Sequence, residues 1–158
     1  MGDFAPVLTQ LLVAAIITFV CVCIQTVSNI ALLFWVLHEL KRLGLKHWVV
    51  WSVSVIVRLI FAFIGIHLAQ LGVWTLSYLL LGCFARVEEA LFFSIASFST
   101  AEHGDTALPR EWRLLGPLEG FNGIIAFGLS IGFMYTVINR MLEDRMRRMQ
   151  EAERQANK

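Results

Sequence analysis

Polar positions divide the chain into three long apolar segments and one shorter one. The first apolar segment runs from about Pro6 to Leu37, the second begins at Trp48 and continues to residue 72 or further, and the third begins after Pro117. A helix needs about 20 apolar residues to span the hydrocarbon core of a bilayer, and each segment is at least that long. The pattern predicts an all-α integral membrane protein with three transmembrane helices.

The shorter segment, residues 86–98, is amphipathic and lies between the second and third predicted spans. As a helix it would reach about 20 Å, which is too short to cross a bilayer. Its length fits a re-entrant helix, and Glu88 and Glu89 near its start would complement the helix dipole. The loop that follows, residues 99–105, would be tolerated at membrane depth only if it were buried in protein or lined a water-filled cavity.

This pattern predicts three parts. An N-terminal transmembrane helix occupies residues 1–42, a central unit occupies residues 48–140, and a charged tail occupies residues 141–158. The central unit would contain an outer helix (48–72 or longer), a short helix (86–98), a loop (99–105) and an inner helix (117–140). We expect the tail to continue the last helix into water, with pairs such as Glu143–Arg147 and Asp144–Arg148.

Composition and charge support a membrane location. The chain is 58% hydrophobic, against about 45–50% for soluble domains. A net charge of +1 gives no argument for a nucleic-acid partner. Basic residues follow the first and third spans, which predicts that both of these ends are cytoplasmic and that the N-terminus lies outside. We therefore expect a multi-pass protein of the cell (inner) membrane, with the bilayer as its surroundings.

Few polar residues interrupt the spans. Arg58 is expected to snorkel or to pair with an acidic residue, and His67 and Gln70, one helical turn apart, are expected to face another helix. The three cysteines match neither a disulfide framework nor a zinc site. There is also no glycine-rich phosphate loop and no catalytic triad on a soluble scaffold, so we expect no enzymatic activity and no organic cofactor.

The stretch between the second and third spans resembles the pore loop of bacterial potassium channels, including the two-pore-domain type. The resemblance covers residues 48–140. It is carried by Glu89 and Phe92-Phe93-Ser94 in the short helix, by Phe98-Ser99-Thr100, by Gly104-Asp105, by Leu108-Pro109, and by Glu111-Trp112-Arg113-Leu114-Leu115-Gly116 before the glycine-bearing inner helix.

The resemblance implies a homotetrameric pore that conducts cations passively, because one loop supplies only a quarter of the ion-binding ring. The five filter positions would be Thr100, Ala101, Glu102, His103 and Gly104, and Asp105 would lie at the outer mouth. Two residues would support the filter, Glu89 and Asn122. The resemblance also makes Gly128 the candidate gating hinge, and close helix packing through Gly128-x-x-x-Gly132 is the alternative.

Two filter positions depart from the family pattern, because Glu102 stands where the family has glycine and His103 where it has tyrosine. Keeping the glycine backbone would cost about 1–2 kcal/mol per subunit. A ring of Glu102 carboxylates would suit a divalent cation, and His103 could bind a metal or sense pH. In the alternative, Glu102 turns toward the outer vestibule or toward the short helix and is not a ligand, and His103 packs as an aromatic ring.

Two functions follow from these observations. The first is a tetrameric, potassium-channel-like cation channel whose potassium selectivity Glu102 calls into question. The alternative is a non-conducting membrane protein on a channel scaffold, which would bind a metal or a partner through Glu102, His103 and Asp105.

Overall fold

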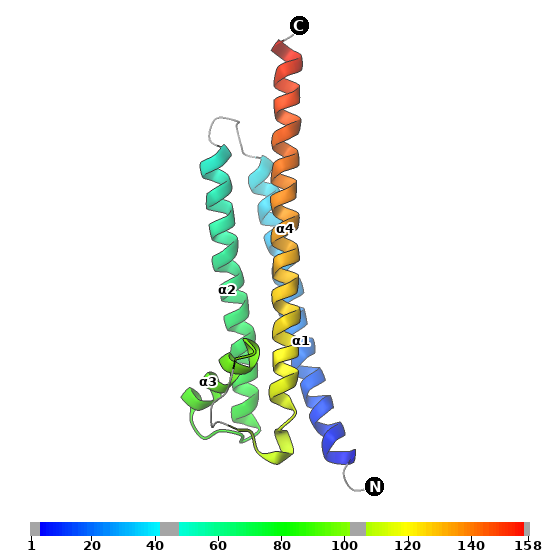
Figure 1. Ribbon diagram of the computed structural model, residues 1–158, viewed down its shortest axis with the longest axis vertical. Coiled ribbons are helices and arrows are strands. Elements are labelled where there is room, and N and C mark those ends of the chain that lie inside the picture. Colours follow the sequence, from blue (N-terminus) through cyan, green and yellow to red (C-terminus); the bar gives the residue numbers. More distant parts are fainter. Residues whose placement is uncertain (1–3, 42–47, 102–106, 157–158) are drawn as a thin grey trace.

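The computed structural model describes residues 4–41, 48–101 and 107–156, and every regular element in these ranges is helical. The elements are α1 (Phe4–Lys41), α2 (Trp48–Leu80), α3 (Val87–Phe98), the short 3₁₀ helix η2 (Arg110–Trp112) and α4 (Leu115–Ala156) (Figure 1). The helix α2 continues through Gly72 to Leu80, because a glycine within a packed helix removes no hydrogen bond.

Three helical stretches are long and apolar enough to cross a membrane, as the sequence predicts: Pro6–Leu40, Val50–Leu80 and Arg110–Gln155. Large apolar side chains point outward along all three, including Phe19 (69% exposed), Phe61 (68%) and Ile131 (70%). Such exposure would be unfavourable in water, and it is the normal condition of side chains that face lipid.

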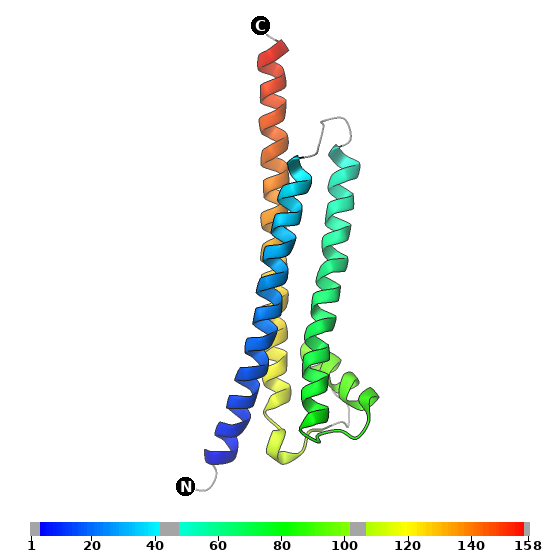
Figure 2. The same ribbon diagram turned by 180° about the vertical axis from the view of Figure 1, so that it is seen from behind.

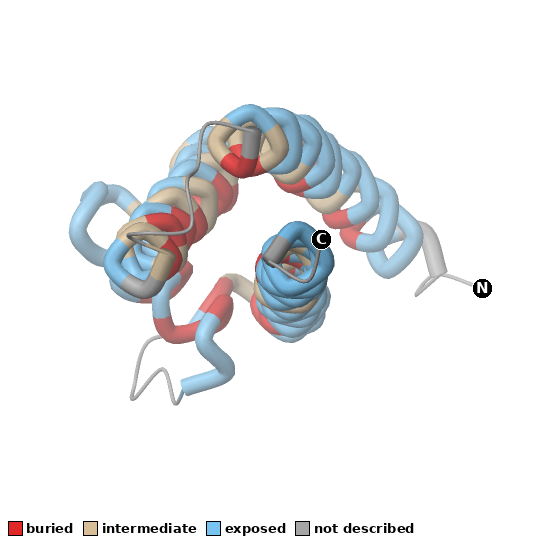
Figure 3. The backbone as a smooth tube through the Cα atoms, turned by 90° about the horizontal axis from the view of Figure 1, so that it is seen from above, coloured by how far each residue is buried: buried red, intermediate tan, exposed pale blue. Residues whose placement is uncertain are grey.

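The three long helices run side by side, with α1 and α4 in the same direction and α2 in the opposite direction (Figures 1 and 2). The view along the long axis shows α1 and α2 covering one side of α4 and leaving another side open (Figure 3). The short helix α3 packs against both α2 and α4 near the end of the molecule where α2 ends and α4 begins (Figure 1).

Two apolar clusters hold the ends of the bundle together. At the α3 end, Trp74, Tyr78, Phe93 and Leu115 are buried in one cluster, in which the Tyr78 and Phe93 rings meet edge to face at 5.3 Å. At the opposite end, buried residues of α1, α2 and α4 form the second cluster: Val36, Leu40, Val55, Leu59, Phe63, Val137 and Met141. The membrane-spanning core is therefore tied at both ends.

Charged side chains complete the second end. Arg148 on α4 donates from Nε to Asp144 at 2.7 Å and from Nη2 to the Leu40 carbonyl of α1 at 3.2 Å. The predicted Asp144–Arg148 pair is thereby confirmed, whereas the ion pair of Glu143 is with Arg140, at 3.6 Å. Because Leu40 lies in the last turn of α1, its carbonyl has no partner within the helix, and Arg148 satisfies it.

Two further contacts fix α2 at this end. The guanidinium of Arg145 lies 4.4 Å from the centre of the Trp48 ring at the start of α2. Arg58, expected to snorkel or pair, lies 3.6 Å from the Glu39 carboxylate of α1. The α2 helix is thus joined to both of its neighbours by charged groups as well as by apolar contacts.

Candidate functional site at the short helix

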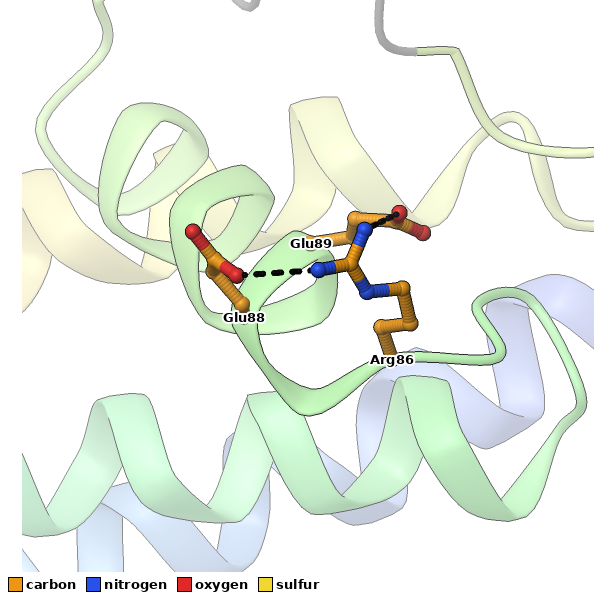
Figure 4. A network of polar contacts seen from close by, with 3 residues as sticks. All are labelled: Arg86, Glu88 and Glu89. Atoms are coloured by element: carbon orange, nitrogen blue, oxygen red, sulfur yellow. Dashed lines mark hydrogen bonds and ion pairs between the residues drawn. The ribbon is translucent and has the colours of Figure 1, made fainter.

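The short helix α3 begins with an exposed cluster of charges. Gly82 turns the chain after α2 with a φ of +69°, and Arg86 is extended before the first turn of α3. Arg86 then lies 3.3 Å from Glu88 and 3.5 Å from Glu89 (Figure 4). Ion pairs as exposed as these contribute little to stability.

Glu89, one of the two residues expected to support the filter, belongs to this cluster and does not lie near Thr100. Its side chain is 47% exposed and points to Arg86. Thr100 is 11 residues further along the chain, about 16 Å away along a helix axis. Glu89 therefore belongs to the charged cluster at the start of α3.

Three glycines allow the last turns of α3 to lie directly on α4. A Cβ atom at Gly123 would lie 2.2 Å from the Phe98 carbonyl oxygen, and one at Gly120 would lie 3.0 Å from the Ser97 carbonyl oxygen. At Gly116 the nearest atom would be Phe93 Cζ at 3.0 Å. This glycine seam, Gly116, Gly120 and Gly123, brings the two helix backbones closer than any side chain would permit.

Gly128, the residue expected to be a hinge, lies further along the unbroken helix α4. A Cβ atom added at Gly128 or at Gly132 would meet no other described atom of the protomer within 4 Å. The expected close contact through Gly128-x-x-x-Gly132 is therefore not made within the described part of one chain, and both glycines belong to the open side of α4.

A buried carboxyl group joins three helices at this site. Glu119 of α4 accepts a hydrogen bond from the Tyr78 hydroxyl of α2 at 2.7 Å and another from the Ser94 hydroxyl of α3 at 2.5 Å. The side chains of Glu119, Tyr78 and Ser94 are completely buried. This triad ties α3 to the spans on both of its sides and fixes its position between them.

Sequence analysis missed Glu119, although a signal for it was present. An ionisable residue inside a span is costly and usually marks a functional or structural site. Glu119 is the acidic residue that follows Pro117 at the start of the third apolar segment. Its two partners lie 41 and 25 residues away in the chain, so their identity depended on the fold.

The chain leaves α3 by a sharp turn at Thr100. Its φ is 57°, which makes it the one non-glycine residue with positive φ in the described ranges. The Thr100 and Ala101 amides donate to the Ser97 and Ala96 carbonyls at 3.0 and 2.8 Å, which closes the end of the helix. A β-branched residue in this conformation costs about 1–2 kcal/mol, so the packing around α3 must hold it there.

Thr100 also lies against the glycine seam, since its methyl group would be 3.7 Å from a Cβ at Gly120. Two of the predicted filter residues, Thr100 and Ala101, are thus placed at the C-terminal end of α3. The other four predicted positions, Glu102, His103, Gly104 and Asp105, lie outside the described residues. So does the metal site that the sequence assigned to Glu102 and His103.

A polar network connects the three long helices beside the site. Gln70 of α2 donates to the Gln25 side chain of α1 at 2.8 Å, and Gln25 donates to Ser130 of α4 at 3.2 Å. Ser130 lies 3.3 Å from Nε2 of His67. His67 and Gln70 therefore face other helices, as the sequence predicts, and interhelical hydrogen bonds hold α1 to the bundle.

The His67 ring connects this network to the end of α3. Its centre lies 5.9 Å from the Phe98 ring, the last residue of α3, and 4.9 Å from the Phe127 ring of α4. The polar network is therefore in contact, through His67, with the residue two positions before Thr100.

Asn122, the other residue expected to support the filter, faces α1 and α2. It is 2% exposed, and with Gln25 and Gln70 it lines a cavity of about 10 Å³. Within the described residues, Asn122 Nδ2 and Gln70 Oε1 have no hydrogen-bond partner.

Comparison with family models, with curated proteins and with solved structures gives no match. Among the described residues, no group of three or more His, Cys, Asp or Glu side chains is placed to hold a metal ion, and all three cysteines are free thiols.

Proposed function

We propose that this protein is the pore-forming subunit of a homotetrameric, potassium-channel-like cation channel. One observation carries the proposal: a helix too short to span a membrane is fixed between two spanning helices and ends in a left-handed Thr100. The glycine seam and the Glu119–Tyr78–Ser94 triad fix it there. This arrangement supports a pore helix followed by a filter loop, because the loop would start at a fixed point with defined backbone direction.

The open side of α4 supports assembly into an oligomer. It carries exposed apolar side chains, among them Phe121 (62% exposed), Ile124 (58%) and Ile131 (70%), beside Gly128 and Gly132. Small residues next to large ones permit close packing between membrane helices. In the proposed tetramer, four α4 helices face one another across the ion path, and each subunit contributes one copy of the loop.

The ion-binding groups would begin with the Thr100 carbonyl and hydroxyl and continue through the carbonyls of residues 101–104. Glu102 in place of glycine would bring four carboxylates near one axis, and oxygen ligands of this charge favour divalent cations. We therefore propose that the wild-type pore prefers calcium or another divalent cation over potassium.

The proposed orientation in the cell (inner) membrane places the N-terminus outside and the charged tail in the cytoplasm. Arg140, Arg145, Arg147 and Arg148 gather at the end of the bundle opposite α3, where the positive-inside tendency favours the cytoplasmic side. The loop after α3 would then open to the outside, as an ion filter requires.

Flux from liposomes tests the proposal. The purified protein is reconstituted with potassium, sodium or calcium as the only permeant cation, and flux is measured for the wild type and for Glu102→Gly/His103→Tyr. We expect calcium flux in the wild type and potassium flux in the double variant. Absence of flux for all three cations in both proteins, with an intact oligomer in detergent, would contradict the proposal.

A further inference from the structure

A groove runs between α1 and α4 at the end of the bundle opposite α3. Its deeper part has a volume of about 460 Å³ and is lined largely by apolar side chains, including Leu33, Val36 and Tyr135. Its shallower part has a volume of about 240 Å³ and is lined by Leu40 and by charged residues of α4. Leu37, Arg140 and Glu143 line both parts, so the two hollows adjoin.

The groove changes in character along the helix axes. Arg140 follows Tyr135 by five residues, about 7.5 Å along a helix, and Arg147 follows Arg140 by seven residues, about 10.5 Å. Arg148 contacts the last turn of α1 at Leu40, which places the charged part at the end of the first span. The apolar part therefore lies within the candidate span, and the charged part, where three arginines face Glu143 and Asp144, lies at its end.

The arginines of the groove differ in the hydrogen bonds and ion pairs that they form within the protein. Arg148 is held by Asp144 and by the Leu40 carbonyl. Arg140 has a side chain that is 63% exposed and only a 3.6 Å contact with Glu143, while no ion pair is formed by Arg147 within the described residues. Arg140 and Arg147 are seven residues apart, so they lie on the same face of α4 and can act together.

We propose that this groove binds an anionic glycerophospholipid of the surrounding membrane. Its phosphate lies between Arg140 and Arg147, and one acyl chain lies along Leu33, Leu37 and Tyr135. Guanidinium groups bind phosphate oxygens through paired, charge-assisted hydrogen bonds. A free phosphate ion matches only the shallow part and leaves the deeper apolar hollow unfilled, whereas a lipid matches both.

The bound lipid joins α1 to α4 along a seam between the two helices. One end of the seam lies at the Arg148–Leu40 hydrogen bond, and Val36 and Val137, which also belong to the apolar cluster, line its deeper part. This assignment does not depend on ion conduction, so it remains testable whatever the flux experiment shows.

Native mass spectrometry of the full-length protein tests the proposal. The protein is titrated in detergent with phosphatidylglycerol, with phosphatidylcholine of the same acyl chains, and with glycerol 3-phosphate alone. We expect retained adducts with phosphatidylglycerol, and at least tenfold weaker binding of the other two. Each of Arg140→Gln and Arg147→Gln should weaken phosphatidylglycerol binding about fivefold, as expected for one basic residue at a membrane surface.

Two matched controls separate the groove from the general charge of the tail. Arg154→Gln removes the same charge from an exposed position near the end of α4, outside the groove, and should leave binding unchanged. Leu33→Trp fills the deeper hollow without a change in charge and should reduce phosphatidylglycerol adducts at least fivefold. Leu12→Trp, at an exposed position elsewhere on α1, should not.

Three outcomes would overturn the proposal. The first is equal retention of the two lipids, and the second is an equal loss of binding in Arg154→Gln and in the groove variants. The third is an oligomer that dissociates in Leu33→Trp while the number of bound lipids per chain stays constant, which would show that a second copy of the chain covers the groove.

Discussion

The Tyr78 hydroxyl of α2 donates a 2.7 Å hydrogen bond to the Glu119 carboxyl group of α4, and both side chains are completely inaccessible to solvent. The Ser94 hydroxyl of α3 donates a hydrogen bond to the other carboxyl oxygen. A buried carboxyl group is unfavourable unless both of its oxygens accept hydrogen bonds. Loss of either hydroxyl therefore removes one hydrogen bond and also leaves a buried carboxyl oxygen without a donor.

Tyr78→Phe should therefore destabilise the protein by about 1–3 kcal/mol, because it leaves a buried carboxyl oxygen without a donor. The measurement is thermal unfolding in detergent, monitored by tryptophan fluorescence. Tyr135→Phe removes the same atom from a side chain that is 66% exposed, and it should change stability by less than about 0.5 kcal/mol. Equal midpoints for the two variants would show that the Tyr78–Glu119 contact does not hold α3.

Gly123→Ala should displace α3, because the new methyl group would lie 2.2 Å from the Phe98 carbonyl oxygen. Overpacking of this kind costs about 1–3 kcal/mol. Gly128→Ala is the matched control: no described atom of the protomer lies within 4 Å of its Cβ, and alanine is the better helix former by about 1 kcal/mol. In detergent micelles that keep the protein monomeric, we expect Gly123→Ala to unfold at a lower temperature than the wild type. Gly128→Ala should unfold at the same temperature as the wild type or at a higher one.

Comparing the same glycine variants in the assembled form separates packing between subunits from packing within one. If Gly128 faces another subunit, Gly128→Ala should weaken the oligomer while the isolated chain keeps its stability. An identical loss for Gly123→Ala and Gly128→Ala in the isolated chain would contradict the glycine seam.

The Gln25–Gln70 pair should show a coupling energy in a double-mutant cycle. Gln25→Leu and Gln70→Leu each leave one buried amide without its 2.8 Å partner, while the double variant removes both groups. Hydrogen bonds between membrane helices contribute about 0.6 kcal/mol on average and up to about 1.7 kcal/mol. Unfolding in a denaturing detergent should therefore give a coupling within this range, and strict additivity would argue against the bond.

Cys83 should react slowly with alkylating reagents. Burial raises the pKa of its thiol to about 11, and the nearby Glu111 carboxylate adds to the shift. The thiolate is the reactive form, so at pH 8 maleimide should react roughly a hundredfold more slowly than with free cysteine, and the rate should rise about tenfold per pH unit up to pH 10.

The experiment on Cys83 uses a Cys21→Ala/Cys23→Ala background, in which Cys83 is the sole cysteine. Glu111→Gln should lower the thiol pKa and increase the rate at a fixed pH. A rate that levels off near pH 9 in the parent background would contradict the raised pKa.

The spans were predictable because the number of consecutive apolar residues is itself the physical requirement for crossing a bilayer. The polar contacts within the spans were predictable only in kind. Gln70 was expected to face another helix, but its partner Gln25 lies 45 residues away, and no local pattern relates the two. Arg58 was expected to snorkel or to pair with an acid, and only the fold identified that acid as Glu39.

The candidate site was harder to predict, because sequence analysis gave weight to conspicuous residues. Glu89 drew attention as an acid in the short helix, yet Arg86 engages it at the exposed start of α3. Glycines were noted along the inner helix with Gly128 as the candidate hinge, but the close contact of α4 with α3, made by Gly116, Gly120 and Gly123, was not foreseen. Which side of a helix meets a neighbour depends on how the whole bundle packs.

The uninterrupted course of α4 has a mechanical consequence. A single helix of 42 residues, about 63 Å long, carries Glu119 near one end and the basic groove and tail toward the other. A rotation of the tail about the helix axis is transmitted as torsion to the residues that hold α3, unless α4 unwinds between them. The charged tail and the residues that hold α3 therefore belong to one continuous element, and neither can turn about the helix axis independently of the other while α4 stays intact.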